Sequence, residues 1–184
     1  FIASARAWWM FRAMGHDDVA VLDGGLPAWI AAGGATEDLP LARQERHFTA
    51  RARADLVKSL AQMQTHVTAA DIEVIDARPG PRFAGTAPEP RAGIVSGHMP
   101  GAKSLPHGGL IQPDGRMRPA AEIKTAFDAA GADLSRQLVT TCGSGVTAAV
   151  LALGLARLGH FDVAVYDGSW AEWASQPNAP VVTE

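Results

Sequence analysis

The chain of 184 residues has a single cysteine, Cys142, and it lacks long apolar runs and any strong excess of one charge. One cysteine excludes an internal disulfide framework and a zinc site built from several cysteines. The longest apolar candidate, 148–158, is interrupted by Gly154 and Arg157, so no segment approaches the ~18 apolar residues of a membrane span. A net charge of −3 argues against nucleic acid or an anionic membrane as the main partner.

Two segments of the chain read as copies of one unit. Residues 15–24 (GHDDVAVLDG) and 159–168 (GHFDVAVYDG) match at an offset of 144 residues, from 15 to 159, and the same offset carries Trp29 onto Trp173. A match of this length in one register indicates an internal repeat. Both tryptophans are therefore expected to anchor the core of their copy.

The first copy has no counterpart of Cys142, because the equivalent position would fall before Phe1. We expect a C-terminal remnant of a first copy at 1–34, a linker at 35–54 and a complete second domain at 55–184. The apolar residues of the remnant would need cover from an N-terminal segment or another chain; they are Trp8, Trp9, Phe11 and Val21. Without a signal peptide in view, the free cysteine favours the cytoplasm.

Local signals predict an α/β fold in which strands and helices alternate around a parallel sheet. Asp55 is expected to cap a helix, and the proline- and arginine-rich segment 78–96 predicts a long functional loop. Helices are expected at 4–14, 27–32, 55–66, 119–130, 147–158 and 170–174, and strands at 19–22, 72–75, 138–141 and 163–166.

The candidate nucleophile lies where a predicted strand meets a predicted helix. Strand 138–141 runs directly into the loop 142–147, which reads CGSGVT and opens the helix 147–158. Ligands of open α/β sheets collect beyond the carboxyl ends of strands, and a helix start offers free N–H groups with a partial positive charge. Two glycines let the loop curl so that these N–H groups converge. Such a loop favours the thiolate form of Cys142, which is the nucleophilic form.

This loop and several other segments resemble the rhodanese superfamily. The matching motifs are DAR at 76–78, RFAG at 82–85, PEPRAG at 88–93, SGHMPGA at 96–102 and YDGSWAEW at 166–173. The loop itself is similar to that of 3-mercaptopyruvate sulfurtransferases, since thiosulfate sulfurtransferases usually have basic residues after the cysteine. The resemblance spans essentially the whole chain and implies a rhodanese-like domain with a central parallel sheet flanked by helices, plus the C-terminal remnant of a second such domain.

The resemblance also implies a two-step covalent reaction without cofactor or metal. Cys142 would take the sulfur of 3-mercaptopyruvate as a persulfide and release pyruvate. Because the chain has no second cysteine, an external acceptor such as thioredoxin, glutathione or cyanide would remove the outer sulfur.

Substrate roles follow from the same resemblance. Arg82 and Arg91 occupy positions that hold substrate in similar enzymes, and planar guanidinium groups bind carboxylates bidentately. Ser144 either relays a proton to the leaving enolate or braces the loop. Thr147 is also a candidate helix cap. The backbone N–H groups expected to stabilise the persulfide are those of Gly143, Gly145, Val146 and Thr147.

Structural roles are expected for Arg78, as the partner of a carboxylate that braces the loop, and for His98, within a turn motif. His107 borders the site in one interpretation. Three alternatives stay open: a phosphatase of the same fold, a non-catalytic binding module, and a thiosulfate sulfurtransferase. The phosphatase needs an arginine six residues after the cysteine, where the chain has Ala148. A binding module has no need of Cys142, and the dianion thiosulfate favours a more cationic loop.

Overall fold

The computed structural model describes residues 1–38 and 45–183, so residues 39–44 of the predicted linker and Glu184 lie outside the described residues. A five-stranded sheet has the order β1-β5-β4-β2-β3, and all neighbouring strands run parallel, as predicted. The strands are β1 (Val57–Lys58), β2 (Ile72–Asp76), β3 (Lys103–Ser104), β4 (Gln137–Thr141) and β5 (Ala164–Tyr166).

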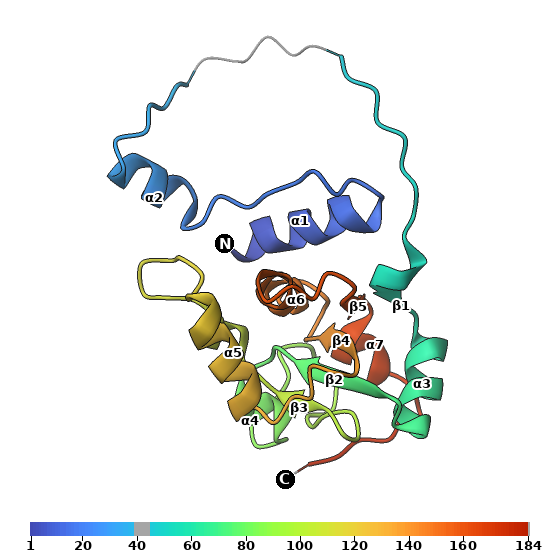
Figure 1. Cartoon of the computed structure of the whole chain (residues 1–184). Coiled ribbons are helices and arrows are strands. Elements are labelled where there is room, and N and C mark those ends of the chain that lie inside the picture. Colours follow the sequence, from blue (N-terminus) through green and yellow to red (C-terminus); the bar gives the residue numbers. More distant parts are fainter. Residues whose placement is uncertain (39–44, 184) are drawn as a thin grey trace.

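Helices cover both faces of this sheet (Figure 1). One core lies between the sheet and helices α1, α5 and α6, and the other lies between the sheet and helices α3 and α7. The helices are α1 (Ile2–Ala13), α2 (Gly25–Ala31), α3 (Leu60–Ala69), α4 (Gly80–Phe83), α5 (Ala120–Ala129), α6 (Ala148–Arg157) and α7 (Ser169–Trp173), with 3₁₀ turns η1 (Ala54–Leu56) and η2 (His107–Leu110). No helix of the described ranges is long and apolar enough to cross a membrane.

Helix α6 lies between α1 and the sheet and is rich in Ala and Leu, which suits close packing on two sides (Figure 1). Trp8 and Trp9 of α1 are buried on this side, and the Trp9 indole N–H donates to the Leu56 carbonyl at 3.2 Å. The expectation that these tryptophans need another segment or chain as cover was therefore wrong, because the second copy covers them. Phe11, on another face of α1, is 48% exposed, and Val21 packs partly buried against the same core.

The predicted strand 19–22 is absent: these residues form extended coil, and Leu22 is 54% exposed. In the second copy β5 is paired with both β1 and β4, whereas no strand of the described residues pairs with 19–22. Trp29 is likewise not a core anchor: it is 44% exposed, while its counterpart Trp173 is fully buried, as predicted. The two matching segments therefore differ in structure: among the described residues, 159–168 contributes β5 to the sheet, and 15–24 contributes no strand.

The helix predicted at 55–66 begins later, as α3. Ser59 is the cap: its side chain accepts from the Gln62 N–H and the Gln62 side chain returns a bond to the Ser59 N–H, which is a capping box. Asp55 lies in η1 instead, and its Oδ2 pairs at 2.7 Å with Nη2 of Arg53, the residue just before η1. The predicted helices at 119–130 and 147–158 appear as α5 and α6, and the predicted loop 78–96 contains only the short α4.

Candidate active site

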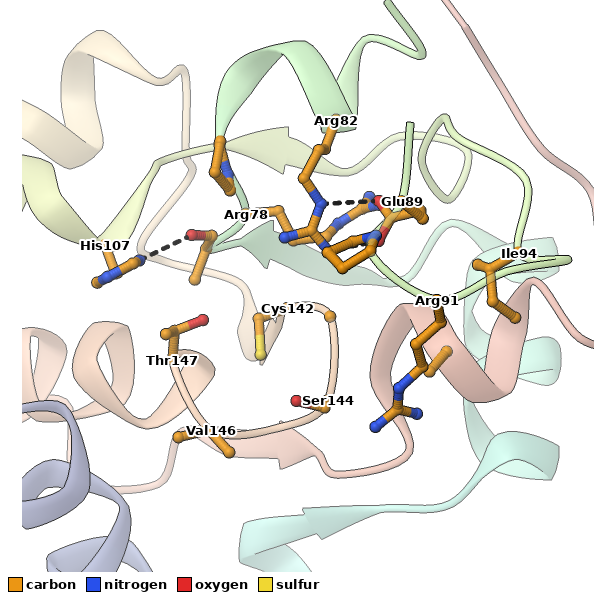
Figure 2. Close-up of a pocket in the computed structure, with 15 residues that line it drawn as sticks. Arg78, Arg82, Glu89, Arg91, Ile94, His107, Cys142, Ser144, Val146 and Thr147 are labelled. Atoms are coloured by element: carbon orange, nitrogen blue, oxygen red, sulfur yellow. Dashed lines mark hydrogen bonds and ion pairs between the residues drawn. The ribbon is translucent and has the colours of Figure 1, made fainter. Parts of the chain in front are cut away.

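A pocket of about 330 Å³ lies beyond the carboxyl ends of β2 and β4 (Figure 2). The long loop after β2 forms one wall, and the loop between β4 and α6 forms the floor, so two neighbouring strand ends supply most of the lining, as the parallel topology requires. Of the predicted site residues, the pocket brings together Arg82, Arg91, Cys142, Gly143, Ser144, Val146 and Thr147.

Cys142 lies at the floor of the pocket, only 2% exposed, and its backbone is held from behind by the start of α7. The Trp170 N–H donates to the Cys142 carbonyl at 2.9 Å, and the Ala171 N–H donates to the Gly143 carbonyl at 3.1 Å. With both carbonyls bound on that side, the nucleophile loop 142–147 has a fixed start.

Ser169 is a site residue that sequence reasoning missed. Its Oγ accepts a hydrogen bond from the Cys142 N–H at 3.2 Å and lies 3.9 Å from Cys142 Sγ. Its hydroxyl also donates to the Tyr166 carbonyl at 2.9 Å. Burial, with a smaller contribution from Glu172, raises the pKa of Tyr166, so its phenol stays protonated. Through its contacts with Cys142, Ser169 orients the cysteine, and its only signal in the sequence is its place in the motif YDGSWAEW at 166–173.

Gly145 does not line the pocket; it lies on the outer side of the nucleophile loop. Its φ is +79°, and a β-carbon there would lie 2.4 Å from Asp167 Oδ1 and 2.6 Å from the Asp167 carbonyl oxygen. Only glycine fits this close approach. Arg6 lies on the same outer side of the loop and links it to Asp167: its Nη1 donates to the Gly145 carbonyl at 3.2 Å and to Asp167 Oδ1 at 2.5 Å.

Replacing Gly145 by alanine is expected to lower the reactivity of Cys142 toward iodoacetamide at least tenfold and to lower stability by roughly 1–3 kcal/mol, because the loop must shift away from Asp167. Gly131→Ala is the matched control: its φ is +73° but nothing lies within 4 Å of the added β-carbon. The control should lose stability from backbone strain alone, with Cys142 reactivity unchanged. Equal alkylation rates in both variants would contradict this description of the loop.

Arg82 reaches over the nucleophile loop from α4 (Figure 2). Its Nη2 lies 3.0 Å from where a β-carbon on Gly143 would be, so the glycine lets the guanidinium approach. Glu89, which sequence reasoning missed, is buried beneath it and accepts from Arg82 Nε at 3.1 Å and from Arg82 Nη2. The same carboxylate also accepts from Arg78 Nη1 at 2.8 Å. One acidic side chain therefore orients two arginines of the long loop.

Arg78 is 1% exposed and braces the loop, as expected. Besides Glu89, it binds Asp76 Oδ2 at 2.7 Å and the Gly97 carbonyl at 2.7 Å, and it lies 4.4 Å over the Trp170 ring. His98 also has the expected structural role: its ring stacks on Phe83 and hydrogen-bonds the Phe83 carbonyl at 2.9 Å.

The remaining predicted residues occupy the rim and walls (Figure 2). Arg91 is exposed and extends toward the side of the loop that carries Ser144, and its side chain makes no hydrogen bond or ion pair with any described residue. His107 forms the opposite wall, with Nδ1 3.3 Å from the Ala77 carbonyl. Thr147 is the N-cap residue of α6, as expected, but its side chain makes no cap bond and lines the pocket instead. Among the described residues, no three His, Cys, Asp or Glu side chains gather as metal ligands.

These features define an α/β domain with a cysteine loop above the carboxyl edge of a parallel sheet. The rhodanese-like domain model matches residues 56–176, and the chain belongs to the rhodanese family. This match covers the predicted catalytic domain and leaves out 1–34, so the assignment of that segment as the remnant of a first domain stays a prediction.

Relatives and solved structures agree with this family. The chain is 42% identical to thiosulfate/3-mercaptopyruvate sulfurtransferase 1, mitochondrial, of Arabidopsis thaliana, over 97% of this chain and 53% of that protein. It is 41% identical to 3-mercaptopyruvate sulfurtransferase of Mus musculus, over 93% and 58%. The crystal structure of SseA from Escherichia coli, described as a 3-mercaptopyruvate sulfotransferase, superposes with a TM-score of 0.78 at 34% identity, over 92% and 63%. The chain thus spans little more than half the length of these curated relatives.

Proposed function

We propose that this chain carries the catalytic domain of a sulfurtransferase that takes sulfur from 3-mercaptopyruvate as a persulfide on Cys142. The observation that carries the proposal is the pocket in which Cys142 lies beneath Arg82 and Arg91. The pocket is large enough for a small molecule, and it places a nucleophilic sulfur beside guanidinium groups that can bind the carboxylate of a donor.

The reaction has two steps. The Cys142 thiolate attacks the sulfur of 3-mercaptopyruvate, an S–S bond forms, and the C–S bond breaks with its electron pair moving to the carbon fragment as the pyruvate enolate. The enolate takes up a proton and leaves as pyruvate. An external thiolate or cyanide then attacks the outer sulfur and returns Cys142 as a thiolate. The chain has one cysteine, so the proposed acceptor is external, with thioredoxin and glutathione as candidates. The proposed reaction uses no cofactor.

The carboxylate of the donor would bind Arg91 and the free edge of Arg82. The Arg91 guanidinium forms no bond to a described residue, so all of its N–H donors are available to a ligand. Ser144, exposed at the rim, is close enough to the nucleophile in sequence to deliver the proton to the enolate or to brace the loop. Backbone N–H groups of the loop residues that line the pocket, Gly143, Ser144, Val146 and Thr147, would stabilise the negative charge on sulfur.

The charge of the site favours a monoanionic donor. Three arginines of the long loop, Arg78, Arg82 and Arg91, are balanced by two carboxylates, Asp76 and Glu89, which leaves one net positive charge. 3-Mercaptopyruvate carries one carboxylate, whereas thiosulfate is a dianion. Thiosulfate remains the second candidate donor because the Arabidopsis relative is named for both. A cytoplasmic location stays a prediction, since that relative is named as mitochondrial.

Parallel assays of the two donors test this proposal. We expect pyruvate release from 3-mercaptopyruvate with dithiothreitol as acceptor, and much weaker sulfur transfer from thiosulfate to cyanide. Turnover of thiosulfate alone would replace the proposed donor by the second candidate. Turnover of neither donor, with Cys142 present, would favour the binding module.

Replacing Glu89 by glutamine is expected to shift donor preference toward thiosulfate, because the pocket gains one positive charge for the second negative charge of the donor. The ratio of kcat/KM values for thiosulfate and 3-mercaptopyruvate should rise by roughly tenfold, which corresponds to about 1.4 kcal/mol. Glu122→Gln, which removes an exposed carboxylate on α5 paired with Arg118, should leave the ratio unchanged. An unchanged ratio in the Glu89 variant would refute the charge explanation.

A further inference from the structure

Arg6 connects α1 to the nucleophile loop, although α1 lies outside the segment matched by the family model. Its Nη1 donates to the Gly145 carbonyl at 3.2 Å and to Asp167 Oδ1 at 2.5 Å, and its guanidinium lies 4.5 Å over the Trp9 ring. The side chain is largely buried, so these contacts hold it in one place. A residue about 140 positions before the cysteine thus contacts the loop that carries it.

The bond to Gly145 fixes the direction of one peptide group. In a planar trans peptide the carbonyl of one residue and the N–H of the next point in opposite directions. Because the Gly145 carbonyl points to Arg6, the Val146 N–H points away from α1. Val146 lines the pocket on the side where Cys142 lies (Figure 2).

Without the guanidinium, this arrangement would be unfavourable. The Gly145 carbonyl oxygen and Asp167 Oδ1 both accept from Arg6 Nη1, so two negatively polarised oxygens lie close to each other. A cation between them turns this repulsion into two charge-assisted hydrogen bonds. If the peptide turned over, an acceptor would replace a donor on the pocket side of the loop, and a negatively charged sulfur would lose stabilisation.

We propose that Arg6 is a positioning residue for the nucleophile, which holds the Gly145–Val146 peptide so that the Val146 N–H faces the sulfur of Cys142. The inference rests on the proposed function for its role in turnover, but the effect on the reactivity of the thiol does not depend on the identity of the donor.

Arg12 provides a matched control on the same helix. Its side chain also bonds outside α1, to the Phe161 carbonyl at 3.4 Å, and lies 5.4 Å over the Phe161 ring, but among the described residues no hydrogen bond or ion pair joins it to the nucleophile loop. A residue that acts only by docking α1 should behave like Arg12. A residue that orients the loop should change the chemistry of Cys142.

The test compares Arg6→Gln, Arg6→Lys and Arg12→Gln in the full chain. The readouts are the second-order rate of Cys142 alkylation by iodoacetamide at one neutral pH, kcat and KM for 3-mercaptopyruvate, and Tm. Arg6→Gln should lower the alkylation rate and kcat about tenfold, less than the 10²–10³ lost when an oxyanion donor is itself removed, with KM within about twofold. Arg6→Lys should restore most of both rates, because its ammonium group can donate to both oxygens. Arg12→Gln should lower Tm and leave both rates unchanged.

Equal losses in Arg6→Gln and Arg12→Gln, or no loss in Arg6→Gln, would overturn the proposal. Arg6→Met, which keeps an apolar stem against Trp9, is the second variant if the glutamine variant does not fold, with the same expected rates. If the wild-type chain alkylates but does not turn over 3-mercaptopyruvate, the proposed function fails, while the alkylation rates of the variants still decide the role of Arg6.

Discussion

Replacing Cys142 by serine is expected to abolish pyruvate release from 3-mercaptopyruvate, with a fall in kcat of at least about 10⁴-fold. The chain has no other cysteine, so no neighbouring thiol can take over the sulfur. The fold should persist, because the backbone of the loop accepts from the Trp170 and Ala171 N–H groups and donates to Ser169 Oγ, and the substitution leaves these bonds in place. A coupled assay for pyruvate measures the loss, and Tm checks the fold.

Ser144→Ala is the control for a general disturbance of the nucleophile loop. It leaves the thiol in place, so the protein should still take up sulfur from the donor, whatever the effect on the rate of pyruvate release. Pyruvate release that survives in Cys142→Ser would show that another group breaks the C–S bond, and the persulfide mechanism would then be wrong.

Replacing Arg91 by glutamine is expected to raise KM for 3-mercaptopyruvate by roughly 10–100-fold with a smaller change in kcat. The physical reason is the loss of a charge-assisted contact to the donor carboxylate, typically worth about 1.5–3 kcal/mol. The Arg91 side chain has no hydrogen-bond or ion-pair partner among the described residues, so the substitution breaks no such bond of the described fold. Steady-state kinetics with pyruvate detection measures the change.

Arg116→Gln is the matched control, because Arg116 is also exposed but pairs with Asp114 away from the pocket. Its KM should equal that of the wild-type protein. An unchanged KM in Arg91→Gln would mean that Arg82 alone holds the carboxylate, or that the donor lies elsewhere in the pocket, and either result contradicts the proposed role of Arg91.

The position of the nucleophile could be predicted from the sequence because it depends on local order. A strand that ends at Thr141, a glycine-containing loop and a helix that starts near Thr147 are consecutive, and a parallel sheet determines which edge such loops occupy. Arg82 and Arg91 came from the resemblance to a family, and the structure brings both to the pocket. The long loop that carries both arginines has little helical or strand periodicity, so its sequence alone does not predict where their side chains lie.

The rest depended on partners distant in the sequence. Arg6 and Gly145 are separated by 139 positions, and Ser169 follows Cys142 by 27, so no local pattern links either pair. Segment 19–22 has the composition of a strand, yet a strand exists only where a neighbour supplies hydrogen bonds. Asp55 was the expected cap, but Ser59 caps α3 because Gln62 completes its capping box.

Glu89 shows a further limit. A carboxylate between two arginines in a proline-rich loop reads as a solvated charge, and only the structure shows that it is buried and shared between Arg78 and Arg82. Such a residue controls the charge that the pocket presents to a donor, and sequence patterns carry little information on burial within irregular loops.

The most direct test of the central claim is the mass of the intact protein after brief exposure to 3-mercaptopyruvate, followed by peptide mapping and by treatment with excess thiol. We predict a gain of one sulfur atom, located at Cys142 and removed by the thiol, with pyruvate released in equal amount. An unmodified Cys142 that iodoacetamide still alkylates after the same exposure would contradict the account.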